Sequence, residues 1–344
     1  MRVLFAFRMK QHSRVLATMG LSVIWIVFLF NVQFHFSDSS TKTSSKDHLE
    51  NSKRGLYSYT ANTPSPISTM KNPYVLQEQV VCSSNDSSTT LVLVHSATEN
   101  LQKRMAIRST WGDPKRLISF GFTLVFLLGK PLHPQSQYGI EHEYLKNKDI
   151  VQGQFVDTYH NLSHKAVLGL RWVSEHCNGV HMIVKMDDDV FLNLPSLSTL
   201  VLKFNRSRQK RQVMCDVCEQ GNPDHVKIHR HGSKWNVNPN EFRTYVMFPF
   251  AFCSGYITIL KMKLVSALYK ASSTTPLFWI DDVYVYGILA QKVGHVVHRQ
   301  LNSVTKDVAK AERCFSKERY SCELVAVLTA NTDTCYYLWY LIQG

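Results

Sequence analysis

Short continuous apolar runs alternate with helical patterns along the middle of the chain. Residues 91–95 (LVLVH) and 122–128 (FTLVFLL) are two such runs. Runs of this kind are typical of strands covered on both faces, so we expect both to be parallel and central in a sheet. Residues 99–111 lie between them and have Leu101 and Met105 at helical spacing. The order strand, helix, strand predicts an α/β arrangement.

A second helix and strand lead into an acidic triplet. The residues at positions 166, 170, 173 and 177 are apolar, at spacings that predict an amphipathic helix. Residues 181–186 (HMIVKM) then predict another strand, and Asp187-Asp188-Asp189 follows it directly. Three carboxylates therefore lie at the carboxyl end of a strand, where open α/β sheets form their ligand crevice.

The acidic triplet predicts a divalent metal site. Adjacent carboxylates repel one another, and burying them unpaired costs several kcal/mol, so a triplet between apolar segments needs a compensating cation. In an extended chain Asp187 and Asp189 project to the same side. One can bind Mg²⁺ or Mn²⁺, which bridges to a diphosphate, while the other orients a metal-bound water or a ligand hydroxyl. The alternative is a solvated acidic turn.

A second acidic pair, Asp281-Asp282, lies within the apolar and aromatic segment 276–285 (PLFWIDDVYV). Apolar surroundings raise the pKa of a carboxyl group and suit it to act as a base. The alternative is a helix N-cap, because Asp favours that position and residues 283–289 can continue as a helix. The two roles do not exclude each other.

The amino terminus predicts the compartment. Several basic residues precede an apolar, uncharged segment, 15–36, and the first acidic residue is Asp38. Such a segment is long enough to span a bilayer, and its one-sided basic flank keeps residues 1–14 cytoplasmic. We expect a cytoplasmic tail (1–14), a transmembrane signal-anchor (15–36), a flexible stem (37–88) and one lumenal domain (89–344). A cleaved signal peptide is the alternative. Sequons fit lumenal glycosylation at Asn85, Asn161 and Asn205.

Composition and charge narrow the class of protein. The 344 residues are 44% hydrophobic and 19% charged, which allows a large core and excludes wholesale disorder. A net charge of +13 suits a nucleic acid, an anionic surface or a phosphorylated small molecule. A lumenal chain does not meet nucleic acid, so we expect no nucleic-acid partner and interpret the basic segment 203–211 as a solvated loop.

Eight cysteines are too few for a disulfide scaffold in a chain of this length. Cys215-x-x-Cys218 is followed by histidines, but too closely for a zinc finger, so a disulfide is the favoured interpretation; the histidines are His225, His229 and His231. A further disulfide can form among Cys314, Cys322 and Cys335, although the pairing does not follow from sequence.

Six blocks of sequence, in order between about residues 90 and 300, resemble the β-1,3-galactosyltransferase family, which includes related N-acetylglucosaminyltransferases. The blocks are RMAIRSTWG (104–112), DTYHNLSHK (157–165), KMDDDVF (185–191), SKW (233–235), FCSGY (252–256) and DDVYV (281–285). Two blocks depart from the family pattern. Asp281 stands where the family usually has Glu, and Ser254-Gly255-Tyr256 lacks the extra glycines common in that loop.

The resemblance implies a GT-A-like fold, with a nucleotide-binding mixed sheet flanked by helices, and transfer of a sugar from a UDP donor with inversion. It implies Mn²⁺, with Mg²⁺ possible, held by Asp187 and Asp189, and Asp189 is the favoured direct ligand. Asp282 matches the family's carboxylate base. The candidate donor-binding residues are Arg104, Arg108, Asp187, Asp188 and Gly255.

Several of these roles have structural alternatives. Arg104 and Arg108 can meet the diphosphate or pair with acids such as Asp157. Trp111 and Trp235 can stack on a sugar or on uracil, or belong to the core. Gly255 allows close approach of the backbone to donor or acceptor, because it lacks a Cβ.

The sequence and the resemblance together predict a Golgi type II membrane hexosyltransferase. It would transfer galactose or N-acetylglucosamine, from UDP-galactose or UDP-N-acetylglucosamine, to a glycan on protein or lipid, forming a β-1,3 linkage. Two alternatives stay open: a catalytically inactive, membrane-anchored carbohydrate-binding protein with the same fold, and a metal-dependent phosphotransferase.

Overall fold

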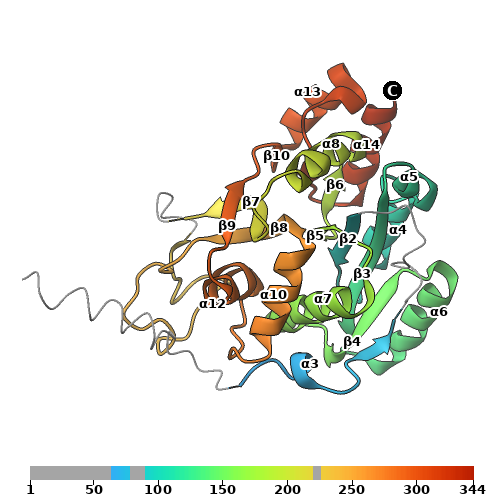
Figure 1. The fold of residues 1–344 in the computed structure, drawn as a ribbon. Helices are drawn as coiled ribbons and strands as arrows, with labels where there is room; N and C mark the ends of the chain where they lie inside the picture. Colours follow the sequence, from blue (N-terminus) through green and yellow to red (C-terminus); the bar gives the residue numbers. More distant parts are fainter. Residues whose placement is uncertain (1–62, 78–89, 220–225) are drawn as a thin grey trace, which may run out of the picture. The chain divides into compact units, whose positions relative to one another are not determined.

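The predicted apolar strands form the centre of a mixed sheet in the computed structural model, which describes residues 63–77, 90–219 and 226–344 (Figure 1). The strand order in this eight-stranded sheet is β1-β4-β3-β2-β5-β8-β7-β9. The strands are β1 (Tyr74–Leu76), β2 (Thr90–His95), β3 (Phe122–Lys130), β4 (Ile150–Val156), β5 (Met182–Asp187), β7 (Gln212–Cys218), β8 (Phe252–Lys261) and β9 (Val297–Gln300).

The inner strands are parallel, as predicted. β4, β3, β2 and β5 pair in parallel, whereas β8 is antiparallel to β5 and to β7. In the β2–β5 pair, His95 lies opposite Asp187, so the carboxyl ends of these two strands adjoin. The acidic triplet therefore begins beside the turn that follows β2.

Helices cover both faces of the sheet (Figure 1). Because successive strand residues point to opposite faces, Val92 and Val94 pack in the core beneath α4, α5, α6 and α8, while Leu93 faces α7 and α10. The α-helices are α3 (Pro66–Thr69), α4 (Leu101–Ser109), α5 (Pro114–Ser119), α6 (Gln137–Asn147), α7 (Leu162–His176), α8 (Leu194–Asn205), α10 (Met262–Ser272), α11 (Asp281–Val283), α12 (Ala290–Val293), α13 (Val308–Glu318) and α14 (Thr332–Gln343). The π-helical turn η4 is Tyr284–Leu289, and the 3-10 turns are η2 (Pro134–Ser136), η3 (Tyr159–Asn161) and η5 (Arg319–Ser321). The patterns over 99–111 and 166–177 correspond to α4 and α7.

The segment from Val304 to the carboxyl terminus, for which the sequence predicted no helix or strand, supports the acidic triplet. It contributes two strands, β10 (Val304–Thr305) and β11 (Ala326–Leu328), to a second, three-stranded sheet of order β10-β11-β6, and the third strand is β6 (Val190–Leu192). β6 follows the triplet directly, and β11 pairs with it antiparallel. Beyond β11, both the backbone N–H and the hydroxyl of Thr329 donate to the carbonyl of Asp189, at 2.7 and 2.9 Å.

The predicted stem, 37–88, extends too far. Part of it forms α3 and β1, and β1 joins the edge of the sheet antiparallel to β4. Ile67 of α3 is buried. This polar segment has too few apolar residues to show a pattern of its own, and its pairing with the edge of the sheet is a contact that the sequence does not predict. Within the ranges given above, no helix is long and apolar enough to cross a bilayer. The tail, 1–14, and the signal-anchor, 15–36, lie outside the described residues.

The disulfides correct one prediction and confirm another. Cys215 is bonded to Cys253 and not to Cys218, which is a free, buried thiol. The bond joins β7 to β8, since a residue in the next strand is closer than one three residues along an extended strand. Cys314 and Cys322 form the expected disulfide near the carboxyl terminus.

Candidate active site

The acidic triplet divides into one internal carboxylate and two accessible ones. Asp188 is 8% exposed and accepts hydrogen bonds from Ser96, Asn100 and Lys103 at 2.7, 2.8 and 3.0 Å. It therefore fastens the triplet to the turn after β2 and to α4. The side chains of Asp187 and Asp189 are 43% and 37% exposed, so the outer carboxylates face the solvent.

These outer carboxylates suit a divalent metal that takes its other ligands from a substrate. Among the described residues, no cluster of three or more His, Cys, Asp or Glu side chains could hold a metal. Mg²⁺ sites commonly use one or two carboxylates together with substrate phosphates and water, so two accessible aspartates fit such a site. Partial burial and the charge of Asp187 raise the pKa of Asp189, although its side chain is 37% exposed. A cation would relieve the repulsion between the two carboxylates.

Lys185 connects the acidic triplet to the second acidic pair. Its ammonium group is buried and donates to Asp187 at 2.9 Å and to the carbonyl of Gly255 at 2.6 Å. Burial alone lowers the pKa of a lysine, but the charges of Asp187 and Asp281 outweigh it, and the pKa of Lys185 is raised. Lys185 is thus a fixed cation between two groups of carboxylates.

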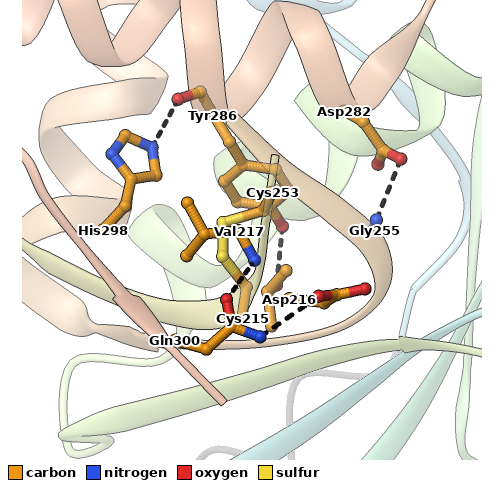
Figure 2. The surroundings of a disulfide bond; sticks show 10 residues. Cys215, Asp216, Val217, Cys253, Gly255, Asp282, Tyr286, His298 and Gln300 are labelled. Carbon is orange, nitrogen blue, oxygen red and sulfur yellow. Dashed lines mark hydrogen bonds between the residues drawn. A yellow bond between two sulfur atoms is a disulfide. The ribbon is translucent and has the colours of Figure 1, made fainter. Parts of the chain in front are cut away.

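Asp282 is held by the backbone of β8. The N–H of Gly255 donates to Asp282 Oδ2 at 2.9 Å (Figure 2), so this carboxylate bonds to the neighbouring strand. The N-cap position of α11 is Ile280, so neither Asp281 nor Asp282 is the N-cap residue. Burial, followed by the charge of Asp281, raises the pKa of Asp282 well above the ordinary value. The raised pKa is what the sequence predicts for a base in apolar surroundings.

The π-helical turn η4, which follows α11 and Asp282 in the chain, is held by two hydrogen bonds of Tyr286. Figure 2 shows Tyr286 with His298 and Asp282. His298 Nε2 bonds to the carbonyl of Tyr286 at 2.8 Å, and the Tyr286 hydroxyl bonds to Thr258 at 2.7 Å. The Cys215–Cys253 disulfide ties β7 to β8 two residues before Gly255. The backbone on both sides of the Asp282 carboxylate is therefore cross-linked to the sheet.

A cavity of about 230 Å³ opens beside Asp282. Its lining combines the carboxylate with polar and aromatic groups from several segments, among them Ser254, Trp235, Lys227, His229 and Lys306. Polar groups that converge on a carboxylate of raised pKa are typical of a substrate site.

The two arginines of α4 are paired with carboxylates of the protein. Arg104 is 1% exposed and makes a two-point ion pair with Glu143, at 2.9 and 2.7 Å. Arg108 makes a two-point pair with Asp149, at 2.8 Å for each bond, and also bonds to Glu143. Their partners are not Asp157, which pairs with Lys165 at 2.7 Å. Arg104 also donates to Ser96 and to the carbonyl of Ala97, and so orders the turn that holds Asp188.

The two tryptophans of the family blocks have different environments. Trp111 is fully buried in the core, whereas Trp235 is 45% exposed and lines the cavity. Trp235 is therefore the one that can contact a ligand.

The sequons also differ. Asn205 is exposed at the end of α8, and Asn85 lies outside the described residues. The amide of Asn161 donates to the carbonyl of Val156 at 2.8 Å, and its sequon serine, Ser163, is buried with its hydroxyl on the carbonyl of Phe278. In the folded domain, the Asn161 sequon is therefore less accessible than that of Asn205.

Sequence reasoning missed Lys185, Lys103 and Thr329. A lysine inside the apolar run HMIVKM was a usable signal, because a buried ammonium needs a carboxylate partner. Thr329 is 140 residues from its partner Asp189, and no local pattern predicts that contact.

The fold and site define a class: an α/β protein with accessible carboxylates at the end of a central strand and a second, raised-pKa carboxylate facing a cavity. Comparison with known proteins specifies it further. A sequence model of the galactosyltransferase family matches residues 102–301. Human beta-1,3-galactosyltransferase 1 is 31% identical over 238 residues, covering 69% of this chain and 70% of that protein. Human beta-1,3-galactosyltransferase 5 is 31% identical over 195 residues, covering 57% of this chain and 60% of that protein.

A solved glycosyltransferase involved in glycosylation of the major capsid of PBCV-1 is 10% identical, with a TM-score of 0.38, over 74% of this chain and 100% of that one. On the sequence matches, the chain belongs to the galactosyltransferase family. It is a hexosyltransferase, and its family implies a nucleotide-sugar donor and a glycan acceptor.

Proposed function

We propose that this hexosyltransferase is a Golgi type II membrane protein with a GT-A-like lumenal domain. It transfers galactose, or N-acetylglucosamine, from a UDP donor to a glycan hydroxyl with inversion, forming a β-1,3 linkage on protein or lipid. The two relatives named above, both beta-1,3-galactosyltransferases, support the donor and the linkage. The basic tail and apolar segment at the amino terminus support the membrane orientation.

Asp187 and Asp189 would hold Mn²⁺ or Mg²⁺ on the donor side. Bound there, the metal would neutralise charge on the departing diphosphate. The protein itself orients these carboxylates: Lys185 holds Asp187, and the two bonds from Thr329 hold the backbone of Asp189.

Asp282 acts as the base on the acceptor side, and its carboxylate at the wall of the cavity is the observation that carries this proposal. It removes the proton of the acceptor hydroxyl while that oxygen bonds to the anomeric carbon. The bond from the anomeric carbon to the UDP oxygen breaks in the same displacement, and UDP leaves with the electron pair. A single displacement from the face opposite UDP inverts the anomeric centre, in the same geometry that separates base and leaving group in inverting glycosidases.

A matched pair of variants tests the two sides separately. We expect Asp189→Ala to abolish Mn²⁺-dependent donor binding, because it removes a metal ligand. Asp282→Asn keeps donor binding and lowers transfer by about 10²–10⁴-fold, the usual contribution of a base. The assays are calorimetric titration with UDP and UDP release with a donor-by-acceptor panel, followed by linkage analysis. Equal donor affinity in wild type and Asp189→Ala would contradict the donor assignment. No turnover with any pair, in a folded protein, would favour a carbohydrate-binding role.

A further inference from the structure

Four aromatic rings gather on the surface beside the proposed base. Ring centroids lie 4.7 Å apart for His160 and Trp279, 6.3 Å for Tyr159 and Trp279, and 6.4 Å for Tyr159 and His160. Lys234 lies over both Tyr159 and Trp235, at 5.5 and 4.5 Å from their ring centroids. We call Tyr159, His160, Trp235 and Trp279 the aromatic platform.

The aromatic platform is open to solvent although its rings are mostly apolar. Tyr159 is 42% and Trp235 45% exposed, and the other two rings are exposed or partly exposed. The rings come from three separate segments: η3, the loop at 233–236 and the segment before α11. Exposed aromatic side chains that converge from distant segments are typical of a binding surface.

The aromatic platform is continuous with the cavity beside Asp282. Trp235 lines that cavity, and so does Ile280, the residue after Trp279. Partial burial raises the pKa of Tyr159, and the charges of Asp281, Asp282 and Asp187 raise it further. Tyr159 is therefore close enough to the site to interact electrostatically with these carboxylates. A ligand that filled the cavity and continued outward would therefore meet these rings.

The cavity and the aromatic platform differ in what they can hold. At about 230 Å³, the cavity is below the range of roughly 300–1,000 Å³ typical of drug-sized ligands, so it accommodates about one sugar ring. Aromatic faces are apolar and carry a negative quadrupole, which suits the C–H face of a second ring. Lys234 and His160 can donate hydrogen bonds to the hydroxyls around that ring.

We propose that the aromatic platform binds the sugar that precedes the acceptor residue, so that the acceptor class is an oligosaccharide of at least two rings. This rests on the proposed function, because it takes the cavity beside Asp282 as the acceptor site. The terminal sugar enters the cavity with its hydroxyl toward Asp282, and the penultimate sugar stacks on the aromatic platform.

Paired acceptors that differ by one ring test the proposal. For a terminal galactose, the probes are methyl β-galactoside and methyl β-lactoside. For a terminal N-acetylglucosamine, they are methyl N-acetyl-β-glucosaminide and methyl β-chitobioside. With wild type, KM for the disaccharide is expected to be about tenfold below that for the monosaccharide, equivalent to about 1.4 kcal/mol. Trp279→Ala and Trp235→Ala should each reduce this ratio to less than threefold, while KM for the donor changes by less than twofold. Trp279→Phe should retain most of the ratio.

The matched control is Tyr138→Ala, which removes an aromatic ring that is 79% exposed on α6 and should leave the ratio as in wild type. An unchanged ratio in both tryptophan variants would overturn the proposal. If no donor-acceptor pair turns over, the proposed function fails, and calorimetric titration of methyl β-lactoside and methyl β-chitobioside tests the aromatic platform by itself. Binding to wild type that both tryptophan variants lose would support it; no binding to wild type, or equal binding to all, would overturn it.

Discussion

Replacing Gly255 by alanine should displace Asp282, the proposed base, without disturbing Asp187 and Asp189, the proposed metal ligands. A Cβ at this position would lie 1.8 Å from Asp282 Oδ1, so the carboxylate must retreat by more than about 1 Å to reach an ordinary contact. The retreat also weakens the hydrogen bond from the Gly255 N–H. A misplacement of about 1 Å can lower a rate about 100-fold. We therefore expect kcat to fall about 100-fold, which is about 2.7 kcal/mol at the barrier and within the whole contribution of a general base.

The assay is the initial rate of UDP release at saturating donor and acceptor, with UDP affinity and the thermal midpoint measured on the same preparation. Gly139→Ala is the matched control, because a Cβ at Gly139 meets nothing within 4 Å. A Gly255→Ala protein that kept kcat within about threefold of wild type, with an unchanged thermal midpoint, would refute the assignment of Asp282 as a base held by Gly255.

Two further predictions concern the charged network. In Lys185→Met, the cation that lowers the pKa of Asp282 is lost, so that pKa rises further. Because the proposed base must be ionised, acidification should abolish activity at a higher pH than in wild type. The pH profile of kcat/KM measures this shift, and Lys185→Arg is the control that retains the charge. An acid limb unmoved by Lys185→Met would contradict the coupling. Arg104→Met removes a two-point hydrogen-bonded pair but leaves Glu143 paired with Arg108. Urea unfolding should therefore show a loss of about 1.5–3 kcal/mol, while UDP affinity stays close to that of wild type. A large loss of UDP affinity without destabilisation would instead favour contact of Arg104 with the diphosphate.

The sequence predicted the parts of the fold that depend on neighbours along the chain. β2, β3 and β5 were visible because strands buried on both faces are continuously apolar, and α7 because its apolar stripe repeats at helical spacing. The location of the acidic triplet at the carboxyl end of the sheet followed directly from the prediction of β5.

What escaped prediction depends on contacts between distant segments. The partners of Arg104 and Arg108, Glu143 and Asp149, lie about forty residues away in a region without a motif. The Cys215–Cys253 pairing required the register of β7 against β8. The aromatic platform required three loops to converge, and loop positions carry no periodic signal.

The strand pair β5–β8 explains how the two sides of the site depend on each other. Lys185 lies opposite Thr258 in this pair, and from there its ammonium bonds both to the carboxylate of Asp187, a proposed metal ligand, and to the carbonyl of Gly255, whose N–H bonds to Asp282. One buried ammonium group therefore interacts with three carboxylates: with Asp187 through a hydrogen bond, and with Asp281 and Asp282 through their charges. Burial and the negative charges of Asp281 and Asp187 raise the pKa of Asp282, and the positive charge of Lys185 only partly offsets them. The basicity proposed for catalysis thus arises from an electrostatic imbalance that a single lysine reduces but does not remove.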